Sequence, residues 1–184
     1  YGRVPDLRAW YVPATEFHAT AELPAEAADS GQLAAACAPL LAGLGAELVR
    51  RQAGVRHLWC SFRHAGLPDR RPPDTRLRIA LRRPTADPDR LRALLALRLA
   101  GVPLPAPVVA VALQAPLVTG CPPTTADWHG GGAAAGERLA AVLDRLRARF
   151  GAHGVRGLAL HADHRPERAW RWTDPVPGRV DGPV

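Results

Sequence analysis

The chain has 184 residues, and 47% of them are hydrophobic, which is enough to bury the core of one ordinary domain. Its 24 basic residues, all of them arginine, outnumber its 17 acidic residues and give a net charge of +7, which favours a polyanionic partner. The sequence shows no signal peptide and no apolar run of about 20 residues, so we expect a cytoplasmic protein with no membrane contact.

Cysteine spacing argues against a metal site or a disulfide framework. Cys37, Cys60 and Cys121 lie far apart and form no Cys-x-x-Cys pair. The segment 161–164 contains two histidines and an aspartate, but no second cluster supplies further ligands, so we predict no metal and no cofactor. A P-loop, a dinucleotide-binding fingerprint and a nucleophile elbow are also missing, and no catalytic residue is predicted.

The first two thirds of the chain alternate between strand and helix patterns. Residues 1–16 have no periodicity and are predicted to be a linker. The predicted elements that follow are a strand over 17–23, a helix from Asp29 or Ser30 to a C′ residue at Gly54, strands over 55–63 and 75–83, a helix from Pro88 to Gly101 and a strand over 108–114. Pro39, inside the first helix, favours a kink or a break there.

This order, β-α-β-β-α-β, is typical of an α+β domain of the ferredoxin-like, split βαβ kind. Each helix has one apolar stripe, so both helices are predicted to cover the same sheet face and to leave the other face open. We assign residues 17–116 to this domain.

The remainder of the chain has a different composition. Residues 117–136 are rich in glycine, proline and threonine and are predicted to be a flexible linker. A C-terminal extension over 137–184 begins with a helix over 137–150 and continues with a short strand over 155–160. The helix is predicted to turn Leu139, Val142, Leu143 and Leu146 inward and Arg138, Arg145, Arg147 and Arg149 outward.

The open sheet face is the candidate site. Arginines at every second position of a strand lie about 7 Å apart, which is close to the spacing of phosphates along one DNA strand. Solvent-facing strand residues are often charged in any case, and Trp59 can either stack on a base or pack against a neighbour. The residues that we predict to contact DNA are His57, Trp59, Arg63, Arg76, Arg78 and Arg82.

Several segments together resemble one known family. They are FHATAELP (17–24), RRQAGVRHLWCSFRH (50–64), LLALRLAGVPLPAPVVAVALQA (94–115), LDRLRARFG (143–151) and ADHRPERAW (162–170). From residue 17 to residue 115 the chain resembles the little-finger domain of Y-family DNA polymerases. With the last two segments it is similar to the C-terminal half of ImuB-type proteins, the Y-family homologues of bacterial mutasomes.

The resemblance implies a non-catalytic adaptor in translesion DNA synthesis. The little finger places its sheet in the major groove of duplex or primer-template DNA, and the catalytic palm and the fingers would lie upstream of Tyr1. The implied partners are an error-prone replicative-type polymerase, a RecA-like accessory protein and the sliding clamp. The tail residues that we expect to contact partners are His164, Arg165, Pro166, Glu167 and Trp170; a solvated turn with Arg–Glu pairing is the simpler alternative.

One segment departs from the family pattern. A clamp-binding peptide normally contains glutamine and a Leu-Phe pair, whereas residues 124–129 read TTADWH. We interpret Asp127 and Trp128 as a degenerate remnant, which makes clamp binding by this chain doubtful. Two alternatives remain open: a fragment of an active Y-family polymerase, and an unrelated ferredoxin-like protein-interaction domain.

Overall fold

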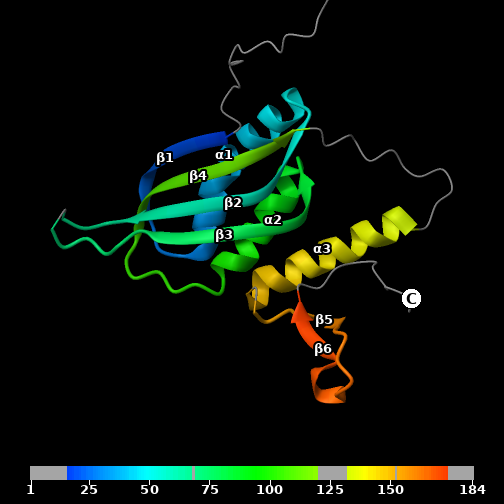
Figure 1. Cartoon of the computed structure of the whole chain (residues 1–184). Helices are drawn as coiled ribbons and strands as arrows, with labels where there is room; N and C mark the ends of the chain where they lie inside the picture. The colour runs from blue at the N-terminus through cyan, green and yellow to red at the C-terminus, as the bar shows by residue number, and fades with distance from the viewer. Residues whose placement is uncertain (1–15, 68, 120–131, 152, 174–184) are drawn as a thin grey trace, which may run out of the picture.

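The computed structural model describes residues 16–67, 69–119, 132–151 and 153–173 (Figure 1). Their fold is mixed α+β, with a four-stranded antiparallel sheet and three helices in the described ranges. The elements are β1 (Glu16–Ala27), α1 (Ser30–Arg50), β2 (Ala53–His64), β3 (Thr75–Thr85), α2 (Pro88–Leu99), β4 (Val108–Thr119), α3 (Gly132–Phe150), β5 (Gly157–Leu160), a 3₁₀ helix (Pro166–Arg168) and β6 (Trp170–Thr173). The predicted order of the first six elements is confirmed.

The sheet has the strand order β1-β4-β2-β3, and every neighbouring pair is antiparallel. Helix α1 connects β1 to β2, and β4 lies between these two strands in the sheet. Strands β1 and β2 with α1 therefore form a split βαβ unit. The β3-α2-β4 connection is split in the same way around β2. As a result β1 and β3 are the two edge strands.

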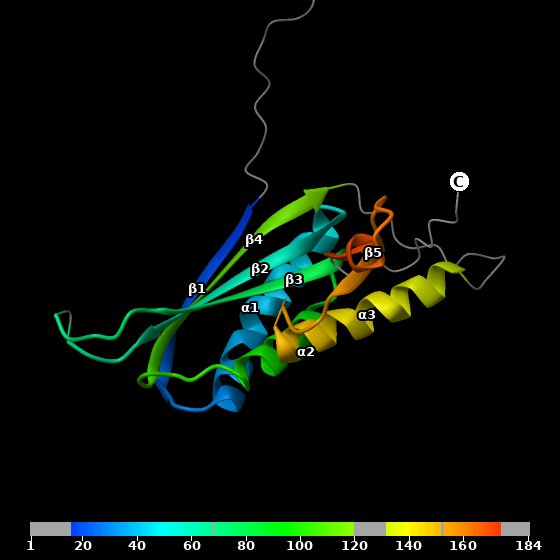
Figure 2. The same cartoon turned by 60° about the horizontal axis from the view of Figure 1, so that its bottom comes forward.

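Helices α1 and α2 pack on the same face of this sheet, as Figures 1 and 2 both show. The residues of β2 that face the helices, Leu58, Cys60 and Phe62, are completely buried. The prediction of one covered and one open face is confirmed.

Helix α1 is continuous through Pro39, so the predicted break does not occur. Asp29 caps it, because its Oδ1 accepts hydrogen bonds from the backbone N–H groups of Gly31 (2.7 Å) and Gln32 (2.9 Å). The free energy gained by burying its apolar stripe outweighs the loss of one backbone hydrogen bond at Pro39. The stripe comprises Leu33, Cys37, Leu41, Leu44 and Leu48. By length and composition alone, this helix is long and apolar enough to cross a membrane, a feature that the sequence analysis overlooked. In this structure it packs on the sheet as a core helix.

The turn after α1 differs from the prediction. The left-handed residue is Gln52, with φ of 48°, and Gly54 already belongs to β2. A Cβ atom at Gly54 would lie 2.8 Å from the Cβ of Pro84, so glycine is needed there for the close approach of β2 to the end of β3. The expectation that Gly54 would end the helix is therefore wrong.

Helix α3 packs beside α2 and the edge strand β3 (Figure 1). The face that it turns toward them is opposite to the one predicted. The buried residues among its described side chains are Ala140, Asp144 and Ala148. Of the predicted inward residues, Leu143 is half-buried, whereas Leu139, Val142 and Leu146 are exposed by 45%, 50% and 39%. Small side chains let this helix approach closely, and a buried ion pair fixes its rotation: Oδ2 of Asp144 accepts a hydrogen bond from the guanidinium of Arg90 at 2.8 Å. The half-buried Arg147 also departs from its predicted outward position.

Candidate nucleic-acid interface

The open face of the sheet presents alternate residues of β2 and β3 in register. Trp59 pairs with Arg78, and Ser61 pairs with Arg76. On its other side Trp59 pairs with Gln114 of β4. No helix in the described part of the chain covers this face (Figure 2). Arg76 and Arg78 are exposed and Trp59 is half-buried, so a ligand can reach all three side chains.

Three of the predicted DNA-contacting residues form one cluster. The guanidinium carbon of Arg78 lies 5.7 Å from the ring centroid of Trp59, a cation–π distance. Arg78 Nη2 also donates a hydrogen bond to Nδ1 of His57 at 3.2 Å, and the rings of His57 and Trp59 are 5.7 Å apart. Partial burial, with the charges of Arg78 and Arg56, lowers the pKa of His57 below its ordinary value of 6.5, which favours the neutral imidazole that can accept this bond.

Among the described residues neither Arg76 nor Arg78 has an acidic partner, and Arg76, unlike Arg78, makes no contact with a neighbouring ring. Its side chain is exposed and makes no ion pair with any residue in the described part of the chain. It lies two residues before Arg78 on the same strand face, which separates the two positions by about 7 Å. The β3 side of the open face therefore carries two adjacent cations that no acidic side chain neutralises.

The β1 side of the same face is acidic. Glu22 of β1 forms an ion pair with Arg63 of β2 across the intervening β4 strand. Glu16 accepts a hydrogen bond from the amide of Gln114 at 2.7 Å. Arg63 is thus on the predicted face, but a carboxylate offsets its charge. Because the sequence separates Glu22 and Arg63 by 41 residues, only the strand order reveals this pair.

Arg82 does not extend the exposed row of arginines. The register between β2 and β3 shifts after Ala80, and Arg82 is half-buried, with its Nε and Nη2 atoms inaccessible to solvent. Its backbone N–H donates to Oδ1 of Asp144 at 3.1 Å. The predicted row therefore has two exposed members, Arg76 and Arg78, and Arg82 belongs to the contact with α3.

The tail residues predicted to contact partners lie on and beside a small two-stranded sheet. His164, Arg165, Pro166 and Glu167 are exposed, and Trp170 begins β6. The pairs Leu158–Trp172 and Leu160–Trp170 lie on one face of that sheet, where all four side chains are exposed by between 44% and 85%. Asp127 and Trp128 lie outside the described residues.

In the described ranges, no group of three or more histidine, cysteine, aspartate or glutamate side chains is placed to hold a metal ion. Cys37 and Cys60 are both buried and free, and burial raises the pKa of the Cys37 thiol to about 12. The sequence reasoning missed Arg98 and Arg147, which line the same pocket as Arg78 beside β3. Nothing in the sequence pattern signals this shared pocket, because it depends on how α3 packs.

Comparison with known proteins yields no assignment. No protein-family model matches the chain, and no curated protein matches its sequence. The geometry of the open face is thus the basis on which a function can be argued.

Proposed function

We propose that this chain is a non-catalytic DNA-binding module of a translesion-synthesis assembly, of the kind its resemblance to ImuB-type proteins implies. The observation that carries the proposal is the pair of unneutralised arginines, Arg76 and Arg78, beside Trp59 on a sheet face without a covering helix. Guanidinium groups at this spacing suit the phosphates of one DNA strand. Contacts of this kind bind DNA without reading its sequence.

The little-finger assignment is part of the same proposal. Its support is the βαββαβ order, with both connections split and both helices on one face. These connections are the ferredoxin-like feature of the domain. The strand order departs from the ferredoxin order, in which the first and third strands are central, since here β4 and β2 are central.

The acidic β1 edge restricts the proposed contact to the β2–β3 half of the face. A duplex laid across the whole sheet would bring its phosphates against Glu16 and Glu22. We therefore propose that the DNA backbone follows β3, with Trp59 and His57 at the border of the contact. The proposal further assumes a cytoplasmic, reducing setting, with which two buried free cysteines are compatible.

The test is duplex binding by the full chain with the double substitution Arg76→Glu and Arg78→Glu, followed by fluorescence anisotropy over a range of salt concentrations. We expect affinity to fall more than about tenfold and the slope of log K against log salt to shrink by about 1.8, which corresponds to two phosphate contacts. The matched control reverses Arg92 and Arg138, which are exposed on α2 and α3, and should retain most of the binding. Equal losses in both variants would show that only net charge matters and would contradict the sheet-face proposal.

The second part of the proposal concerns the C-terminal extension from residue 137 onward. We propose that it is the docking site for the error-prone replicative-type polymerase. The exposed apolar residues Leu139, Val142 and Leu146 of α3 run between exposed arginines, which favours a partner surface with an acidic rim. The Leu–Trp face of β5 and β6 adds further unpartnered apolar area. A RecA-like accessory protein is a second proposed partner. Binding to the sliding clamp stays doubtful, because residues 124–129 lack the glutamine and the Leu-Phe pair of a clamp-binding peptide.

This part of the proposal is tested with the purified error-prone polymerase of the same organism. Interferometry should show binding to the full chain that weakens at least about tenfold in the double variant Trp170→Ala and Trp172→Ala, as expected for aromatic interface anchors. Arg92→Ala is the control. Unchanged affinity in the tryptophan variant would exclude the β5–β6 face as the docking site.

A further inference from the structure

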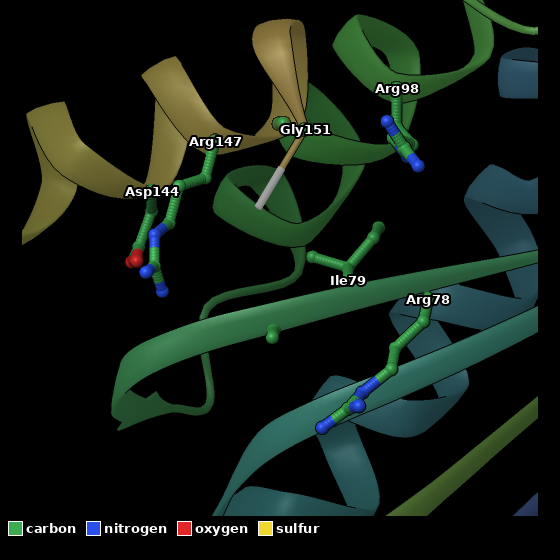
Figure 3. A pocket seen from close by; sticks show the side chains of 8 residues that line it. Arg78, Ile79, Arg98, Asp144, Arg147 and Gly151 are labelled. Carbon is green, nitrogen blue, oxygen red and sulfur yellow. The ribbon is translucent and has the colours of Figure 1, made fainter. Parts of the chain in front are cut away.

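A pocket of about 360 Å³ lies where the edge strand β3 meets α2 and α3. Three arginines line it, one from each element: Arg78 of β3, Arg98 of α2 and Arg147 of α3. Figure 3 shows Arg98 and Arg147 extending from the two helices toward the strand that carries Arg78. The volume lies at the lower end of the range for small-ligand sites, about 300–1,000 Å³, so it suits a single compact group.

The pocket has an excess of positive charge. Asp144 is the one acidic residue that lines it in the described part of the chain, and both of its carboxylate oxygens are engaged. As described above, one oxygen accepts from the Arg90 guanidinium and the other from the Arg82 backbone. Arg98 makes no ion pair with any described residue, so its charge is available to an anion.

Arg78 connects this pocket to the open face of the sheet. It lines the pocket and at the same time contacts Trp59 and His57 on the open face. Consecutive phosphates of a DNA strand lie about as far apart as Arg76 and Arg78. A backbone that passes over these two residues along β3 would next reach the mouth of the pocket.

The end of α3 forms part of the rim of the pocket. Gly151 has φ of 80°, and its N–H donates to the carbonyl of Arg147 at 2.9 Å, which closes the last helical turn. A Cβ atom at Gly151 would lie 3.9 Å from Nη1 of Arg98. The turn therefore brings the end of α3 close to Arg98.

We infer that the pocket is a phosphate site that takes one backbone phosphate of the DNA strand lying along β3, with Arg98 as its main ligand. A guanidinium group binds a phosphate through two parallel hydrogen bonds, and a partly enclosed site strengthens that contact. This inference rests on the proposed function. It makes α3 part of the DNA interface in addition to being the start of the tail.

The first test is the salt dependence of duplex binding by the full chain with Arg98→Ala. Arg92→Ala is the matched control, because Arg92 lies on the same helix, is exposed and does not line the pocket. Arg98→Ala should lower affinity about three- to tenfold and reduce the salt slope by about 0.9, the value for one phosphate, whereas the control should change neither. Thermal melting should be the same for both variants.

The outcomes separate this inference from the proposed function. If Arg98→Ala behaves like its control while the Arg76 and Arg78 reversals lower affinity more than about tenfold, the phosphate pocket is overturned and the sheet-face proposal stands. If the sheet-face reversals also have no effect, the proposed function itself fails.

A second test identifies the source of the phosphate. Inorganic phosphate is titrated into the full chain while NMR follows the Nε–H signal of Arg98. We expect a shift that added duplex prevents, because both ligands compete for one pocket. A shift that persists with saturating duplex would overturn the DNA assignment in favour of a free phosphate compound. No shift at all would overturn the site.

Discussion

The two faces of the four-stranded sheet are made of alternate residues of the same strands, yet different forces hold their side chains. On β2, Leu58, Cys60 and Phe62 face the helices and are completely buried. His57 and Trp59, which alternate with them along the strand, face the open side, where they contact each other and Arg78. The covered face is thus held by apolar burial, whereas the open face is held by contacts between neighbouring polar groups. Residues of the open face can therefore be changed without loss of the core.

The largest expected difference is in stability, and it tests this comparison directly. Phe62→Ala should lower the free energy of unfolding by about 3–5 kcal/mol, because it leaves a cavity between the sheet and the helices. Trp59→Ala, three residues earlier on the other face, should cost about 1 kcal/mol or less. Urea unfolding of the full chain measures both.

Two results would sharpen or break this comparison. Phe62→Leu should recover most of the loss, which would identify the cavity as its cause. A cost for Trp59→Ala as large as that for Phe62→Ala would mean that the tryptophan is a core residue, and the open face would lose its central aromatic side chain.

The smallest expected effect is on the titration of His57. Burial first, and the charges of Arg78 and Arg56 second, hold its pKa below 6.5 in the folded protein. The unfolded chain therefore takes up this proton at a higher pH than the folded chain does. The contribution of His57 to stability is constant above pH 6.5, falls as the pH drops from 6.5 to the folded-state pKa, and is constant again below it.

NMR titration of the imidazole can separate the causes of this lowered pKa. Arg78→Ala removes one of the two charges, so the midpoint should rise while burial keeps it below 6.5. A midpoint that does not move would show that Arg78 and His57 are not in contact in solution. An unfolded control peptide supplies the reference value.

The sequence predicts the sheet domain well, because its elements have strong local signals. Alternating residues identify the strands, and Asp87 followed by Pro88 marks the start of α2, where the carboxylate of Asp87 indeed accepts from the N–H of Asp89 at 2.9 Å. The open face follows from the apolar stripes of two helices. For these elements local pattern and tertiary packing agree.

The sequence fails where contacts between distant segments decide the outcome. Helix α3 has an apolar stripe, and the usual rule would bury it, but a buried Asp144 paired with Arg90 turns the helix the other way. Two other outcomes depend on how the strands pair. A register shift between β2 and β3 removes Arg82 from the exposed row, and the carboxylate of Glu22 neutralises the charge of Arg63. None of these contacts has a signal within one segment.

The hydrogen bond between Asp144 and the backbone N–H of Arg82 has a consequence for self-association. Strand β3 is an edge of the sheet, and the unpaired backbone groups of an edge can recruit a strand from another molecule. At Arg82 the carboxylate takes the place that a carbonyl oxygen of an added strand would occupy. The contact that orients α3 therefore also blocks the edge at that point, so a single aspartate both positions a helix and prevents the sheet from growing there.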